Sequence, residues 1–152
     1  MARTSLQCRE CKKEYDTAFK YVCEDCFGPL DVKYNFPTIT KDTFFNREHT
    51  YWRYFELLPI ENKSNIVSIG AGMTPLIKAD TLGEKLGLNN LYIKNDSVNP
   101  TFSFKDRPAG VAISKAKELG LTAVGCASTG NLASATAAHA AAAGLPCHVF
   151  AP

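Results

Sequence analysis

The sequence predicts an α/β protein, in which a domain with a parallel sheet follows a small cysteine-bearing unit. From residue 66 onward, short apolar runs alternate with helical patterns, as is typical of strands and helices that follow one another in a parallel sheet. A glycine, the residue that commonly ends a helix, follows each of the three helices expected there. The small unit is predicted from four cysteines, arranged as two Cys-x-x-Cys pairs near the start of the chain.

Three segments are therefore expected. Residues 1–35 form the cysteine-bearing unit, which is too short to bury a core of its own. Residues 36–65 form an aromatic-rich connection with one helix at about 50–58, which ends before Pro59. Residues 66–152 form part of the α/β domain, with strands at 66–69, 91–94, 122–126 and 148–150 and helices at 80–86, 104–119 and 132–143.

Composition narrows the class of protein. The 152 residues are 45% hydrophobic and 21% charged, which is ordinary for a soluble globular protein. The net charge of +2 without a run of like charges disfavours nucleic acid and membrane as partners. No apolar run is long enough to span a membrane, and residues 1–7 lack the apolar core of a secretory signal. A cytoplasmic location is the resulting expectation.

The four N-terminal cysteines have metal-ligand spacing. Cys8 and Cys11 are separated by eleven residues from Cys23 and Cys26, a spacing that can close a tetrahedral sulfur site. A zinc-ribbon-like unit with structural zinc is predicted, because four thiolates leave no open coordination position. Free cysteines are the alternative. A nucleic-acid finger is disfavoured because residues 1–33 hold six basic and six acidic side chains.

A lysine stands at an unusual place in "NPTFSFKDRPAG", residues 99–110. Pro108 is tolerated only in the first turn of a helix, so the helix begins close to Lys105. The positive helix start and the flanking Phe102 and Phe104 both disfavour the ammonium form, which leaves an amine able to react with carbonyl compounds. An ordinary surface lysine is the alternative.

A second polar stretch, "ASTGN", follows the strand expected at 122–126. Its hydroxyls and backbone N–H groups lie at the carboxyl end of a strand and the start of a helix, where open α/β sheets bind anionic ligands. A plain helix cap explains the same residues.

Together, "NPTFSFKDRPA" and "CASTGNLASATAAHAAAAGL" resemble the cofactor-lysine and asparagine-loop motifs of the fold-type II pyridoxal-phosphate enzymes, which have a three-layer α/β domain. Within that family they are most similar to threonine synthases. "YWRYFELLPI" and "GAGMTPLIKADTLGEKLGLNNLYIKND" resemble the same enzymes, some of which carry cysteine knuckles at the N-terminus.

The resemblance implies a role for each matching residue. Lys105 matches the lysine that binds pyridoxal 5'-phosphate covalently and then moves protons, and Phe104 matches the residue packed on the pyridine ring. Asn131 matches the asparagine that hydrogen-bonds the cofactor's phenolic oxygen. The substrate's α-carboxylate would be received by Ser128, Thr129 and Gly130. Thr74 is a possible substrate contact, although Met73 departs from the family's usual asparagine.

The implied reaction is that of a carbon-oxygen lyase, which converts O-phospho-L-homoserine and water to L-threonine and phosphate. The resemblance also implies a homodimer for the full-length enzyme. A glycine-rich phosphate loop is missing from residues 1–152, so we expect a fragment with little activity alone. Two alternatives stay open: a related enzyme such as cysteate synthase, and a non-catalytic, zinc-stapled interaction module.

Overall fold

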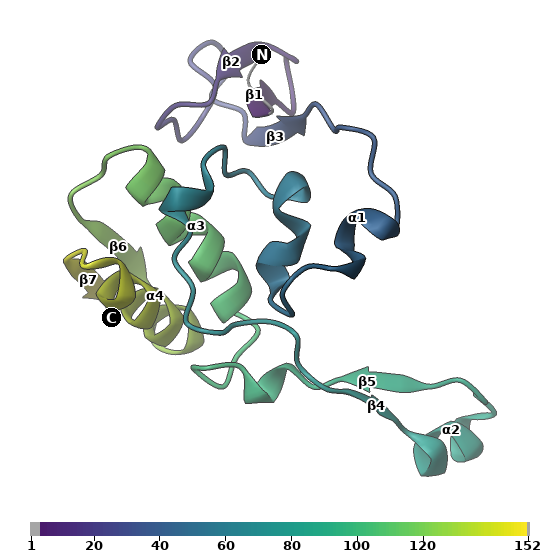
Figure 1. The fold of residues 1–152 in the computed structure, drawn as a ribbon. Coiled ribbons are helices and arrows are strands. Elements are labelled where there is room, and N and C mark those ends of the chain that lie inside the picture. Colours follow the sequence, from purple (N-terminus) through teal and green to yellow (C-terminus); the bar gives the residue numbers. More distant parts are fainter. Residues whose placement is uncertain (1–3, 152) are drawn as a thin grey trace.

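The computed structural model describes residues 4–151 and begins with a small antiparallel sheet. Strands β1 (Thr4–Cys8), β2 (Glu14–Asp16) and β3 (Leu30–Tyr34) lie in the order β2-β1-β3. The register pairs Leu6 with Tyr15 on one side and with Val32 on the other. This sheet lies at the top of the molecule in Figure 1, at one end of α3.

The aromatic connection forms short helices that build one of two small cores. Helix α1 (Asp42–Phe45) is followed by the 3-10 helices η1 (Tyr51–Leu57) and η2 (Lys63–Asn65). The helix expected at 50–58 is thus a 3-10 helix, with a break in its backbone at Tyr54. Trp52 and Phe55 pack in a core with Ile60, which is fully buried.

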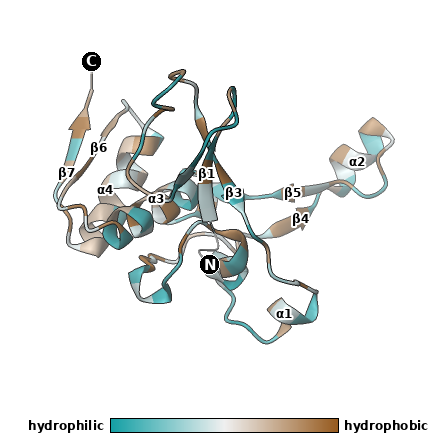
Figure 2. Ribbon diagram, turned by 90° about the horizontal axis from the view of Figure 1, so that it is seen from above, coloured by the Kyte–Doolittle hydropathy of each residue, from teal (hydrophilic) through white to brown (hydrophobic). Residues whose placement is uncertain are grey.

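A hairpin with a helix at its tip projects from the body. Strands β4 (Leu76–Lys78) and β5 (Tyr92–Lys94) pair antiparallel, and α2 (Asp80–Leu86) lies between them in the chain. Figures 1 and 2 both show this arm extending away from the other elements, with hydrophobic colour on β4 in Figure 2. Leu76 is accordingly 64% exposed.

The C-terminal part is a parallel β-α-β unit with one further helix packed on it. The 3-10 helix η3 (Asp96–Val98) leads to α3 (Asp106–Glu118), β6 (Val124–Ala127), α4 (Asn131–Ala143) and β7 (Cys147–Phe150). Strands β6 and β7 are parallel. Ile113 of α3 and Ala140 of α4 form the second core with Val67. Eight of the twelve residues from 132 to 143 are alanine, which allows this close packing.

The predicted α/β pattern is correct for the helices and wrong for part of the sheet. The predicted strand at 66–69 is absent, because the Val67 N–H donates to the Ser114 hydroxyl of α3 at 2.9 Å instead of to a neighbouring strand. The strand at 92–94 is present, but it pairs antiparallel with β4. Within residues 4–151, β6 and β7 are the only parallel pair.

The expected glycines do end the helices. Gly87 and Gly144 are the C-caps of α2 and α4 in the left-handed conformation, with φ of +68° and +69°. These positive angles favour glycine, which carries no Cβ.

Two glutamates join the N-terminal sheet to the far end of α3. The Thr4 N–H and hydroxyl both donate to Glu61 Oε1, at 3.0 and 2.7 Å. The backbone N–H groups of Glu61 and Asn62 in turn donate to Glu118 Oε1, at 2.9 and 2.8 Å. The cysteine-bearing unit is therefore hydrogen-bonded, through one short segment, to the last turn of α3.

Within residues 4–151, no helix combines the length and the apolar character that crossing a membrane requires.

Ser114→Ala tests the bond that replaces the expected strand. The Ser114 hydroxyl is fully buried, accepts from Val67 and donates to the Gly110 carbonyl at 2.7 Å. Loss of this hydroxyl leaves a buried N–H without an acceptor, so we expect the free energy of unfolding to fall by about 1–3 kcal/mol. Urea unfolding measures this. Ser134→Ala, at an exposed position of α4, is the control and should cost nothing; equal effects of the two changes would contradict the bond's role.

Candidate active site and candidate metal centre

Lys105 is the residue directly before α3, which confirms its expected place at the start of the helix. The loop before it is tightly turned. The Phe102 N–H donates to the Asn99 carbonyl at 2.8 Å, and the Lys105 N–H donates to the Ser103 hydroxyl at 3.1 Å. Phe102 has a φ of +59°, a conformation that a bulky residue adopts only when its surroundings impose it. The loop therefore presents the lysine in one defined direction.

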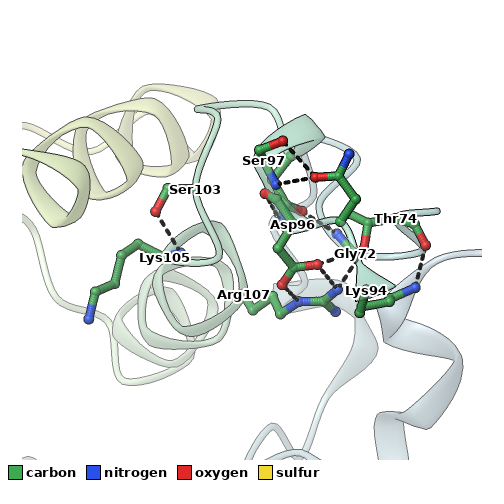
Figure 3. Close-up of polar contacts among 10 residues, drawn as sticks. Gly72, Thr74, Lys94, Asp96, Ser97, Ser103, Lys105 and Arg107 are labelled. Atoms are coloured by element: carbon green, nitrogen blue, oxygen red, sulfur yellow. Dashed lines mark hydrogen bonds and ion pairs between the residues drawn. The ribbon is translucent and has the colours of Figure 1, made fainter. Parts of the chain in front are cut away.

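The Lys105 amine is open to a ligand. Nζ lies 4.8 Å from the centroid of the Phe104 ring. In the described part of the chain no hydrogen bond or ion pair holds this amine, and Phe104 is itself 56% exposed. Figure 3 shows the Lys105 side chain pointing away from the polar cluster around Asp96. A half-buried lysine whose amine lies beside an exposed aromatic ring suits a planar carbonyl compound.

The loop from Ser128 to Asn131 lies between β6 and α4. The Ser128 N–H donates to the Phe150 carbonyl of β7 at 3.0 Å, and the Gly130 N–H approaches the Ser128 hydroxyl at 3.3 Å. Helix α4 begins at Asn131, and its N-cap Gly130 provides no capping side chain. The first amides of α4 therefore form a positive end that can receive an anion.

The structure does not join Lys105 to this loop. Helices α3 and α4 pack together, but the α4 residue facing the first turn of α3 is His139, whose ring lies 3.4 Å from Asp106. His139 is eight residues beyond Asn131, about 12 Å along a helix. In the described residues no hydrogen bond links Lys105 with Ser128, Thr129, Gly130 or Asn131.

Thr74 belongs to a polar cluster that sequence reasoning did not identify. Its hydroxyl donates to Asp96 Oδ1 at 2.6 Å and accepts from Arg107 Nη2 at 3.3 Å. Arg107 also makes a two-pronged ion pair with Asp96, with both bonds at 2.8 Å. Lys94 Nζ donates to the Thr74 carbonyl. The dashed lines in Figure 3 trace these contacts.

This cluster fixes two loops against the first turn of α3. Asn99, only 2% exposed, accepts from the Gly72 N–H at 2.9 Å and donates to the Asp96 carbonyl at 2.9 Å. The hydrogen bonds from Arg107 lower the pKa of Asp96 to about 2. The sequence feature that could have identified Arg107 as part of this cluster was the Asp-Arg pair directly after Lys105. Asp96 gave no such signal, since Thr74 and Arg107 are 22 and 11 residues away from it. The contact of Asn99 with Gly72, 27 residues away, gave none either.

An apolar hollow of about 740 Å³ lies beside the loop, between α3 and the β6–β7 pair. Leu132, Phe150 and Ile113 line it together with other apolar side chains, and Lys115 and His148 are its basic residues. A ligand bearing a phosphate needs several charged or N–H donors, so this hollow does not suit one. The Lys105 amine and the first amides of α4 are the better candidates.

The four cysteines come together, as their spacing predicts. Their Sγ atoms all lie within 4.8 Å of one another, with Cys8 and Cys26 3.4 Å apart and Cys11 and Cys23 3.5 Å apart. Tetrahedral zinc with bonds of about 2.3 Å requires sulfur separations of roughly 3.8 Å. The donor set therefore fits the metal.

One of these thiols is prepared for deprotonation. Tyr15 Oη lies 3.1 Å from Cys23 Sγ and accepts from the Glu24 N–H at 3.0 Å, which leaves the tyrosine proton for the sulfur. This hydrogen bond lowers the pKa of the Cys23 thiol to about 6, although burial acts in the opposite direction. A thiolate is the form that binds a metal.

Comparison with known proteins places the chain among known enzymes. Residues 67–152 match the family model described as pyridoxal-phosphate dependent enzyme. The chain is similar to the threonine synthase of Methanocaldococcus jannaschii, with 42% identity over 96% of this chain and 37% of that protein. It is 44% identical to the threonine synthase of Methanosarcina acetivorans over 97% of this chain and 36% of that protein. The threonine synthase of Synechocystis sp. is 46% identical over 65% of this chain and 26% of that protein. The chain thus spans little more than a third of the length of the first two relatives.

The Arg107–Asp96 pair makes stability depend on pH in acid. Because the folded-state pKa of Asp96 is about 2, below the ordinary value of 3.8, its contribution is complete above about pH 4 and is lost as the pH falls toward 2. We expect Asp96→Asn to be less stable than the unchanged protein at pH 7, by a margin that shrinks between pH 4 and pH 2. Urea unfolding at each pH measures this margin.

Asp80→Asn provides the matched control, because Asp80 pairs with Lys78 at the surface and its side chain is 73% exposed. Exposed ion pairs contribute little to stability, so this change should leave the unfolding free energy almost unaltered. If the difference in unfolding free energy between Asp96→Asn and the unchanged protein stays constant from pH 7 to pH 2, the ion pair with Arg107 is not the source of the pH dependence.

Proposed function

We propose that this chain, which belongs to the pyridoxal-phosphate dependent enzyme family, carries the lysine-bearing part of a threonine synthase. The whole protein would act as a lyase that converts O-phospho-L-homoserine and water to L-threonine and phosphate. The observation that carries the proposal is Lys105, whose amine lies over the exposed Phe104 ring, directly before α3 and inside the matched region. The names of its relatives support the choice of reaction.

The residues present fit the aldehyde carbon, the ring and the phenolic oxygen of pyridoxal 5'-phosphate. Lys105 Nζ is the amine that would hold its aldehyde carbon, and the exposed Phe104 ring beside it would pack on the pyridine ring. Asn131, at the first position of α4, would hydrogen-bond the phenolic oxygen. When bound, the cofactor supplies an electron sink that stabilises carbanions.

Lys105 and the loop before α4 would divide the remaining work. Lys105 Nζ would accept and return protons, since in the described residues no hydrogen bond or ion pair engages it. Ser128, Thr129 and Gly130 would receive the substrate's α-carboxylate, with the positive end of α4 behind them. Thr74 would act through the loop it holds, since its hydroxyl is already bonded to Asp96 and Arg107.

The cysteine unit would hold a structural zinc ion. Cys8, Cys11, Cys23 and Cys26 would fill all four positions of a tetrahedral site, so no position is left for substrate. The ion would stabilise a unit that has only three short strands. Hydrogen bonds from Thr4 to Glu61 and from the Glu61 N–H to Glu118 connect this unit to the end of α3 opposite Lys105. This position is consistent with a zinc ion that takes no part in catalysis.

Activity of the full-length protein tests the proposed reaction. With O-phosphohomoserine and pyridoxal phosphate, we expect threonine and phosphate in equal amounts. Lys105→Ala should lower the rate at least a thousandfold, because it removes both the covalent anchor and the proton carrier. It should also abolish the visible absorption band that lysine-bound cofactor gives.

Lys117→Ala, on the exposed side of the same helix, should keep both the band and the rate. If the band survives Lys105→Ala, the lysine is wrongly assigned. If the band is lost as expected but the unchanged protein makes product only from O-phosphoserine, the cofactor assignment stands and the substrate is wrong.

Metal content tests the zinc site. Freshly purified, reduced protein should contain about one zinc ion per chain, and Cys23→Ser should lose most of it, because a serine hydroxyl is a poor zinc ligand. Elemental analysis by mass spectrometry measures the ratio. Cys126→Ser, in β6, is the matched control and should keep the metal. Equal zinc contents in the two variants would count against the four-cysteine site.

A further inference from the structure

We propose that His139 is a positioning residue for Lys105: its neutral imidazole holds the Asp106 carboxylate and, through it, the turn that presents the lysine. The proposal rests on the proposed function of Lys105 and adds to it. His139 lies on α4, 34 residues away in the chain, and reaches the first turn of α3 through packing of the two helices.

Asp106 ties the lysine loop to the helix. It is the first residue of α3 and is fully buried. Its Oδ2 accepts from the Thr101 N–H at 2.8 Å, across the loop that contains the left-handed Phe102. A carboxylate at a helix start is favoured by the positive end of the helix. The direction of Lys105 therefore depends on Asp106 staying in place.

The second oxygen of Asp106 faces His139. Oδ1 lies 3.4 Å from Nε2 of the imidazole, which is also fully buried. Burial lowers the pKa of His139, against the opposing effect of Asp106, so the ring is neutral near pH 7. No hydrogen bond forms at this separation, and among the described residues neither Oδ1 nor Nε2 has a hydrogen-bond partner elsewhere. Because an unpaired buried carboxylate oxygen is costly, a neutral ring with its proton on Nε2 is the donor that a small approach of the two side chains would supply.

A glycine makes room for this contact. A Cβ on Gly110 would lie 2.3 Å from Tyr51 Oη, closer than real atoms approach, and 3.0 Å from His139 Cε1, tighter than most real contacts. Glycine in the middle of a helix is less favourable than alanine. That cost is offset here, because only glycine lets the histidine ring and Tyr51 pack against α3 at the level of Asp106.

His139 does not act on substrate itself. Its ring is fully buried, whereas the Lys105 amine lies over Phe104 on an accessible surface. The histidine can affect the lysine only through Asp106 and the backbone between them. This separates a positioning role from acid–base catalysis, for which the ring would need to reach the reacting atoms.

Hydrogen exchange of the cofactor-free, full-length protein tests this inference without relying on activity. His139→Phe keeps a planar aromatic ring, although a larger one, and removes both nitrogens. His139→Gln places an amide N–H near the position of Nε2. In the phenylalanine variant, amides of residues 101–107 should exchange about tenfold faster, since a buried carboxylate oxygen loses its donor. Residues 113–118 and the N-terminal sheet should be unchanged. The glutamine variant should return to within about threefold of the unchanged protein.

Asp106→Asn keeps an acceptor for Thr101 but removes the carboxylate, and so tests the same contact if the phenylalanine variant does not fold. It should give the same local acceleration. Unchanged exchange at 101–107 in the variants that fold would overturn the proposal. An equal acceleration throughout the chain would also overturn it, since that is the result of a general packing role.

Steady-state kinetics then separate this inference from the proposed function. With O-phosphohomoserine, His139→Phe should lower kcat about tenfold and change KM less than twofold. The lysine would be misdirected, while the loop at residues 128–130, which would receive the substrate's α-carboxylate, stays intact. His139→Gln should recover most of kcat. An equal loss in the two variants would contradict positioning through Asp106. If the wild-type protein makes no threonine, the proposed reaction is wrong. The hydrogen-exchange experiment still decides the role of His139 in that case.

Discussion

The first turn of α3 is held from both sides by carboxylates, and the candidate active site depends on that restraint. Asp106 faces inward, bonded to the Thr101 N–H and directed at His139. Arg107, the next residue, faces the other way and pairs with Asp96. Lys105 immediately precedes these two residues. Its freedom is thereby limited to its own side chain, because the backbone on either side of it is fixed.

The same helix connects the two sites. At its first turn α3 presents Lys105, and at its last turn Glu118 accepts from the backbone of residues 61 and 62, which lies next to the cysteine-bearing sheet. Ser114, between the two ends, holds Val67. A single helix of 13 residues, about 20 Å long, thus fixes the N-terminal sheet, the connecting segment and Lys105 relative to one another.

The elements that sequence reasoning predicted best are those with strong local signals. Helix α2 has the predicted bounds, and the ends of α3 and α4 are within two residues of those predicted. Their ends are set by residues with local conformational preferences, such as Pro108 in the first turn of α3 and Gly144 after α4. The strand expected at 66–69 is absent because a strand needs a neighbour. Val67 has a serine hydroxyl as its partner instead.

The sequence by itself determined which groups are candidates for covalent chemistry and for metal binding. The spacing of four cysteines and a lysine beside Pro108 are local facts, and residue chemistry follows from them directly. Only the tertiary structure decided what surrounds these groups. Asp96 and His139 are far along the chain from the side chains they face, as Asn99 is from Gly72, and no local pattern marks these contacts. Their contacts form because folding buries charged and polar groups, and each buried group must find a partner wherever packing brings one within reach.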